Sequence, residues 1–435
     1  MKIFFGLLFL CYLFCRFALA ETTEASRNFS YHGQLTTVSQ DKGAMPSAYS
    51  STYSLATGHE SRTSLTATGF FGARLWQGAE AYFNPEVSAG SGLSGTHGMA
   101  GFPNGEIYRV DMPRPKENLS RLYLRQVFSF GEATETVEDA ANKIAGTLPV
   151  QRLSVIFGKF SLNDFFDDNI YSQDPRSQFL NWALMDNGAW DYAADTKGYT
   201  YGVYLEWNRA DWAVRFARVT EPKQANQMAM DLHLAQAYSN NLEFEVRQKI
   251  ENHPGKVRLM VYQNSANMGS YRQTLNTPAY NNDVTQSRAY SKKYGIGLNG
   301  EQELLDHVGA FLRAGWSDGK RETWAFTEID QTLSFGLSLE GDLWGRKPDT
   351  FGLAFIGNGL SRDHRDYLKA GGSGFMLGDG GLNYGLEKII EGYYLWRPLG
   401  KYLGLSGDIQ YVANPGYNLA RGPAWILGAR MHWEI

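Results

Sequence analysis

The chain has 435 residues, with 41 Lys or Arg and 45 Asp or Glu, so its formal net charge is −4. A balance this mild, without a basic run, argues against a nucleic-acid-binding protein. Mean hydropathy is −0.37, and no apolar stretch after residue 20 approaches the length of a membrane helix, which excludes a helical membrane protein. A membrane β-barrel stays open, because its lipid-facing residues alternate with polar ones and average out of hydropathy.

The first residues have the pattern of a secretory signal peptide. A basic residue precedes the apolar run IFFGLLFLCYLFC, and Ala18 and Ala20 fit a small-residue cleavage site. We therefore expect export and removal of residues 1–20. Because Cys11 and Cys15 lie inside this segment, the mature chain would have no cysteine and no disulfide.

Apolar and polar residues alternate with period two along most of the chain. At its end, Trp425, Leu427 and Trp433 fall on one side, and Arg430 and His432 fall on the other. This pattern is typical of a strand with one apolar face. It predicts about sixteen strands, at residues 29–39, 63–76, 78–87, 119–130, 151–160, 198–208, 211–220, 240–250, 256–264, 292–303, 306–317, 326–340, 349–359, 383–396, 402–412 and 424–435.

The predicted connections alternate between short and long. Tight turns fall at residues 77–78, 209–210, 252–255 and 398–401, and long polar segments at 40–62, 88–118, 161–197, 221–239, 265–291 and 360–382. This alternation is typical of an outer-membrane barrel, with short turns on one rim and long loops on the other. We predict an all-β fold, a transmembrane antiparallel up-and-down barrel of about sixteen strands, in one domain over residues 21–435. Residues 131–150 are long where a short turn is due, and we expect a small helix there.

The longest predicted loop, residues 161–197, is too apolar to lie free in solvent. Its large side chains that need burial are Phe165, Phe166, Phe179, Leu180, Trp182, Leu184, Met185, Trp190 and Tyr192. Because a loop of this length is uncommon unless functional, we expect it to fold inward and narrow the pore. There Trp182 and Trp190 could stack on sugar rings, or they could only anchor the loop. The loop residues that could bind hydroxyl groups are Asp164, Asp167, Asp168, Asp174 and Arg176.

Polar positions on the predicted strands would face the lumen of such a barrel. They are Arg74, Glu80, Glu86, Arg121, Tyr123, Arg125, Arg152, Arg215, Glu243, Glu245, Arg247, Arg258, Arg313, Glu387, Glu391 and Asp408. A wall with both charge signs can bind neutral, hydroxyl-rich solutes. It can equally neutralise itself and hold the shape of the barrel.

Four blocks within residues 70–202 are long and specific: GARLWQGAEAYFNPEVSAGSGLS, GMAGFPNGEIYR, RLYLRQ and GKFSLNDFFDDNIYSQDPRSQFLNWALMDNGAWDYAADTKGYTYG. They resemble the carbohydrate-selective porins of the OprB family, and a weaker match continues to the chain end. The resemblance implies a sixteen-stranded barrel in the outer membrane of a Gram-negative cell, through which monosaccharides and similar solutes diffuse passively. The matched positions that it implies at the sugar path are Arg74, Glu80, Glu86, Glu106, Arg109, Arg121 and Arg125.

The resemblance also implies which partners to expect. They are small neutral sugars, outer-membrane lipid and the barrel assembly machinery, with no nucleic acid, cofactor, metal or catalytic residue. Porin chains commonly end on an aromatic residue, whereas Ile435 is last here and Trp433 precedes it by two. The sequence leaves open whether the barrel is a monomer or a homo-oligomer. The alternatives are an outer-membrane barrel hydrolase and a soluble secreted carbohydrate-binding β protein.

Overall fold

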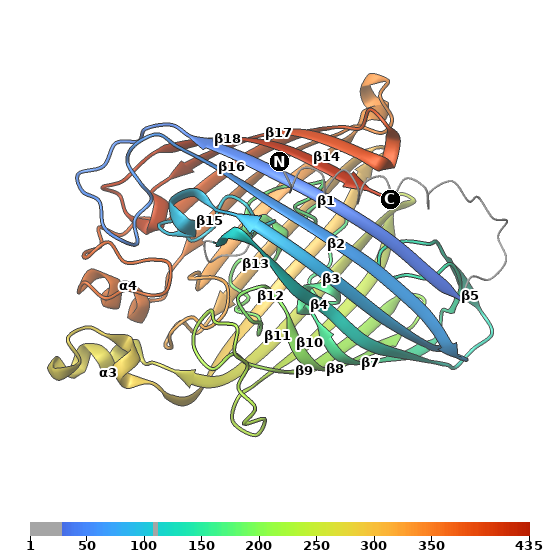
Figure 1. Cartoon of the computed structure of the whole chain (residues 1–435), viewed down its shortest axis with the longest axis horizontal. Coiled ribbons are helices and arrows are strands. Elements are labelled where there is room, and N and C mark those ends of the chain that lie inside the picture. Colours follow the sequence, from blue (N-terminus) through green and yellow to red (C-terminus); the bar gives the residue numbers. More distant parts are fainter. Residues whose placement is uncertain (1–27, 108–111) are drawn as a thin grey trace.

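Strands dominate the computed structural model, which describes residues 28–107 and 112–435, and sixteen of them close into an antiparallel barrel (Figure 1). The barrel strands are β1 (Phe29–Lys42), β2 (Glu60–Trp76), β3 (Ala79–Gly90), β4 (Met112–Ser129), β7 (Arg152–Phe160), β8 (Thr200–Asn208), β9 (Trp212–Thr220), β10 (Tyr238–Ile250), β11 (His253–Met268), β12 (Ala289–Leu305), β13 (Val308–Ser317), β14 (Gln331–Glu340), β15 (Thr350–Gly359), β16 (Glu387–Trp396), β17 (Leu403–Ala413) and β18 (Ala424–Glu434). Each of the sixteen predicted strands overlaps one of them, and the predicted fold class is confirmed. The predicted signal peptide, residues 1–20, lies outside the described residues.

The two ends of the sheet meet, since β1 pairs with β18 from Gln34 opposite Glu434 to Lys42 opposite Ile426. Closure leaves no unpaired strand edge. Period-two alternation gives each strand two different faces. On β10, Phe244 is 45% exposed on the outer wall, whereas its neighbour Glu243 is fully buried on the inner side. The outer wall is therefore apolar and the inner wall polar, as lipid outside and water inside require.

Long and short connections lie at opposite ends of the barrel. The long ones carry α3 (Tyr271–Asn276) and α4 (Arg362–Lys369), which mark the left end of Figure 1, together with η1 (Leu93–Thr96), η3 (Pro278–Tyr280), η4 (Val284–Ser287) and η7 (Pro415–Tyr417). We call this end the loop rim. The other end, the short-turn rim, carries η5 (Gly341–Trp344) and η6 (Gly400–Tyr402). No helix among the described residues is long and apolar enough to cross a membrane.

Residues 131–150 form a two-stranded sheet at the short-turn rim, so the predicted helix is wrong. The sheet pairs β5 (Thr134–Val137) with β6 (Gly146–Pro149). Thr and Val favour extended backbone, because branching at Cβ restricts their side chains in a helix. Asn142 adopts a φ of 58° between the two strands, a left-handed conformation that Asn tolerates and a helix does not allow.

The connection between β7 and β8 folds into the barrel, and we call its residues 161–199 the constriction loop. It contains η2 (Leu162–Asp164) and α2 (Trp182–Met185). The apolar side chains predicted to need burial are buried, except Phe165, which is half-buried and stacks on Tyr204 of the wall at 4.4 Å between ring centroids. Because these aromatic residues pack against the inner wall, the apolar core of the molecule lies inside the barrel.

Candidate functional site

The inner wall holds the constriction loop through buried polar groups. Arg313 on β13 is fully buried, and its Nε lies 2.9 Å from Asp167 Oδ2 of the loop. Its Nη1 donates to the carbonyl oxygens of Ser172 at 2.6 Å and Leu184 at 2.8 Å. Asn299 on β12 donates to both the carbonyl and the carboxylate of Asp167 at 2.8 Å. One guanidinium therefore fixes three points of the loop that are far apart in sequence.

Two further wall residues fix the other half of the loop. Glu391 on β16 accepts hydrogen bonds from the backbone nitrogens of Leu180 and Asn181. Arg430 on β18 donates to the carbonyl oxygen of Gln178 at 2.7 Å. Glu391 was predicted to face inward, and it does, but its carboxylate is occupied by the loop. Because backbone groups of the loop form hydrogen bonds with Glu391 and Arg430, these charged side chains can be buried.

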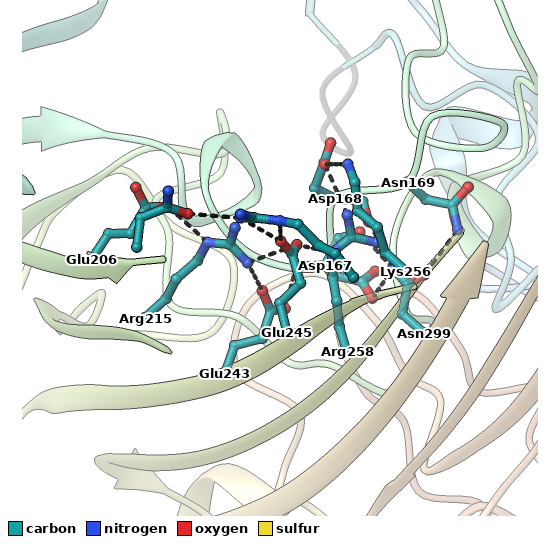
Figure 2. Close-up of polar contacts among 12 residues, drawn as sticks. Asp167, Asp168, Asn169, Glu206, Arg215, Glu243, Glu245, Lys256, Arg258 and Asn299 are labelled. Atoms are coloured by element: carbon teal, nitrogen blue, oxygen red, sulfur yellow. Dashed lines mark hydrogen bonds and ion pairs between the residues drawn. The ribbon is translucent and has the colours of Figure 1, made fainter. Parts of the chain in front are cut away.

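A ladder of alternating charge runs across β8 to β12 beneath the loop (Figure 2). Arg215 contacts Glu206 at 3.1 Å, Glu243 at 2.8 Å and Glu245 at 3.1 Å. Arg258 continues the ladder from Glu245 at 2.7 Å. Its other contacts are Asp168 of the loop at 3.2 Å and Glu301 at 3.3 Å. Opposite charges on neighbouring strands neutralise one another, so this side of the wall is mainly structural.

A cavity of about 360 Å³, the constriction pocket, lies between the constriction loop and strands β2 to β4. Five of the predicted site residues line it, and they are Glu86, Glu106, Arg121, Asp164 and Trp182. So do Asp168, Asp174 and Arg176, which the sequence also suggested as hydroxyl-binding residues, together with Tyr192, Lys197, Tyr199 and Phe326. The lining comes from strands β2 to β4, from the constriction loop and from the segment before β14.

Three acid groups in the constriction pocket have defined partners. Arg121 Nε donates to Asp164 Oδ2 at 2.7 Å, and its Nη2 donates to Asp164 Oδ1. Arg176 Nε donates to a carboxylate oxygen of Glu106 at 2.8 Å. Tyr199 donates its hydroxyl to Glu86 at 2.9 Å. Donors and acceptors of both charge signs thus meet in one small space.

Stacked aromatic rings form another part of the pocket. Trp182 stacks on Phe326 at 4.9 Å between centroids, and Phe326 stacks on Tyr192 at 4.7 Å. Phe102 continues the stack beyond Trp182 at 5.0 Å. The indole Nε1 of Trp182 is buried and has no hydrogen-bond partner among the described residues. Other rings therefore cover both faces of the Trp182 indole, and its Nε1 is a buried donor in the pocket wall.

The remaining predicted residues lie elsewhere. Arg74, Glu80 and Arg125 form a group near the short-turn rim, with Glu80 3.7 Å from Arg74 and 3.6 Å from Arg125. Trp190 is 1% exposed and donates from Nε1 to Asn241 at 3.0 Å, so it anchors the loop and does not line the pocket. Arg109 lies outside the described residues. Sequence reasoning missed Phe326, because it was assigned to a predicted strand with nothing local to mark it as a lining residue.

Comparisons with known proteins agree with this architecture. A family model described as carbohydrate-selective porin, OprB family, matches residues 72–435. A high-pH structure of Pseudomonas putida OprB is similar with a TM-score of 0.68 and 15% identity, covering 94% of each chain. The outer-membrane channel DcaP of Acinetobacter baumannii is similar with a TM-score of 0.51 and 7% identity, covering 96% of this chain and 99% of that chain. At these identities the two structures show the fold alone, and no curated protein matches the chain. Because the family model spans most of its length, the chain belongs to the OprB family of carbohydrate-selective porins, which are channels of the outer membrane rather than enzymes.

Proposed function

We propose that the constriction pocket is where this porin selects small neutral sugars as they diffuse passively down their gradient. The observation that carries the proposal is the aromatic stack of Trp182, Phe326 and Tyr192 next to paired acids and bases. A pyranose has apolar C–H faces and a rim of hydroxyl groups. Its hydroxyls can exchange hydrogen bonds with the charged side chains, while its apolar surface passes the buried aromatic stack in the pocket wall.

Both charge signs in the pocket favour a neutral solute over an ion. Arg121, Arg176 and Lys197 share the lining with Glu86, Glu106, Asp164, Asp168 and Asp174, so both signs are present with a small excess of acids. A volume of about 360 Å³ is near the lower end of small-molecule pockets, roughly 300–1,000 Å³. We infer that monosaccharides enter readily and longer sugars pass more slowly. Binding at such a site has to be weak enough for the solute to leave.

Liposome swelling with the purified, refolded mature protein tests the proposal. We expect swelling with glucose to be faster than with a disaccharide, a trisaccharide or an amino acid of similar size. Thr66 lines the pocket, so Thr66→Trp should slow sugar entry. Thr37 lies on the outer face of β1, so Thr37→Trp is the matched control and should leave entry unchanged. Equal entry rates in the Thr66→Trp and Thr37→Trp proteins would contradict a role for this pocket.

A further inference from the structure

The segment of residues 130–151 at the short-turn rim is long and firmly held. The other connections on this rim are shorter, and residues 77–78, 251–252 and 306–307 are tight turns. Arg74 donates to the carbonyl oxygen of Ala145 at 2.7 Å. Arg152 Nη1 donates to the carbonyl oxygen of Pro149 at 2.9 Å. Both barrel residues hold the β5–β6 sheet, so the segment has a fixed place against the barrel wall.

This segment and the wall enclose a second cavity of about 650 Å³, which we call the rim chamber. Asp164 of the constriction loop lines both the rim chamber and the constriction pocket. On β4, Arg121 lines the pocket and Arg125 lines the chamber, four residues and roughly 13 Å further along the strand. The two spaces therefore adjoin at Asp164, next to the Arg121–Asp164 pair.

Three polar atoms on residues that line the rim chamber are buried and lack a hydrogen-bond partner among the described residues. They are Asn142 Oδ1, Arg152 Nε and Ser154 Oγ. Ser154 is 2% exposed and Arg152 is 9% exposed. A buried polar group without a partner is unfavourable, so a native structure usually satisfies it with water or a ligand. One atom is an acceptor, one is a donor and one is both, which matches the hydroxyl groups of a sugar.

The rest of the lining fits a neutral sugar too. Positive Arg125, Lys143 and Arg152 share the chamber with negative Glu135, Glu138, Asp164 and Glu206, so both signs are present and nearly balanced. Half-buried Phe165, which stacks on buried Tyr204 at 4.4 Å, offers aromatic surface. We propose that the rim chamber is a second sugar-binding station, in series with the constriction pocket, for a neutral monosaccharide or disaccharide. The inference rests on the proposed function, because it extends the same path toward the short-turn rim, which faces the periplasm in outer-membrane barrels.

If sugar binds in the rim chamber, the block of ion current should depend on the side of the membrane to which sugar is added. Sugar added on the short-turn side reaches the rim chamber without crossing the constriction, whereas sugar added on the loop side reaches it only after crossing. In a planar bilayer, sugar binding interrupts the ion current. We expect two binding components from the short-turn side, one of which remains when the constriction pocket is impaired by Trp182→Ala.

The decisive test is a double variant that removes two of the unpartnered atoms, Ser154 Oγ and Asn142 Oδ1, without straining the backbone. Ser154→Ala keeps the side-chain size, and Asn142→Gly tolerates the φ of 58°. The double variant should weaken glucose block from the short-turn side by roughly threefold to tenfold, the loss expected for one or two hydrogen bonds. Ser334 on β14 is also buried with an unpartnered hydroxyl but lies outside the chamber, so Ser334→Ala is the matched control and should change nothing. Orientation can be assigned with an impermeant thiol reagent on Asp306→Cys, an exposed residue of the short-turn rim.

The outcomes separate the two proposals. Unchanged block in the double variant, with sugar entry intact and still sensitive to Trp182→Ala, would overturn the rim chamber alone and leave water as its occupant. Absence of sugar block and of sugar entry in the folded wild-type barrel would overturn the proposed function itself.

Discussion

Arg121 and Asp164 form a two-pronged ion pair where the constriction pocket meets the rim chamber, with Arg121 Nε 2.7 Å from Asp164 Oδ2. Arg121 comes from the wall, and Asp164 comes from the start of the constriction loop. Asp164 also accepts from the backbone nitrogen of Ser161 at 3.1 Å, which holds the carboxylate in place. The two charges therefore neutralise each other between the two cavities.

Removing either partner should therefore expose the other charge to passing ions. Arg121→Gln should make the channel more cation-selective, and Asp164→Asn should make it more anion-selective. A unit charge at roughly 5 Å in water is worth about 0.8 kcal/mol, or about fourfold in ion partition. Reversal potentials under a KCl gradient measure the change. Shifts in the same direction for both variants would show that the pair does not border the ion path.

The indole of Trp182 should matter more for sugars than for other solutes of the same size. Trp182→Ala removes the ring between Phe102 and Phe326 that shapes the pocket wall, and it should reduce glucose entry relative to a similar-sized amino acid, since aromatic contacts are worth roughly 0.5–1.5 kcal/mol. Trp182→Phe keeps the stack and loses the free Nε1, so it should have an intermediate effect. Trp207→Ala, on the outward face of β8, is the control. If both Trp182 variants match wild type in swelling rates, the stack does not select sugars.

The constriction loop should loosen when its main clamp is cut. Arg313→Met leaves Asp167 buried without its cation, and breaking such a pair costs roughly 3–5 kcal/mol. We expect larger ion conductance and entry of trisaccharides that the wild type passes slowly. The double variant Arg313→Met with Asp167→Asn removes the stranded charge and should recover part of the stability. If the Arg313→Met protein keeps the wild-type conductance and the wild-type size limit for sugars, other contacts fix the loop.

Some of this architecture follows from the sequence because lipid and water impose opposite polarity on alternate residues. That rule predicted the strands, and the apolar side chains of the constriction loop predicted its inward fold. Which tryptophan lines the pocket does not follow from it. Trp182 and Trp190 lie eight residues apart in one loop, and their roles depend on Phe326 and Asn241, which are distant in sequence. The charged residues of the wall pose the same difficulty. No neighbouring residue in the sequence distinguishes Arg313, which binds the constriction loop, from Arg121, which lines the constriction pocket.

Asp349 should give the short-turn rim a measurable pH dependence of stability. Its carboxylate accepts hydrogen bonds from Arg346 Nε at 2.6 Å, from the Tyr394 hydroxyl at 2.7 Å and from the backbone nitrogen of Arg397 at 3.0 Å. The hydrogen bond from Arg346 is the main cause that lowers the pKa of Asp349 to about 2. Because this pKa lies below the unfolded value of about 3.9, the stabilisation is complete above pH 4 and is lost as pH falls toward 2.

Asp349→Asn should accordingly lower the free energy of unfolding at pH 7 by roughly 1–3 kcal/mol, the range for hydrogen bonds to a charged group. The difference from wild type should shrink between pH 4 and pH 2, because protonation removes the same charge from the wild-type side chain. Guanidinium unfolding in detergent, followed by tryptophan fluorescence at several pH values, measures it. Glu251→Gln changes an exposed acid on the same rim and serves as the control. If the difference in free energy of unfolding stays constant down to pH 2, the lost stability comes from a change in side-chain packing and not from the charge of Asp349.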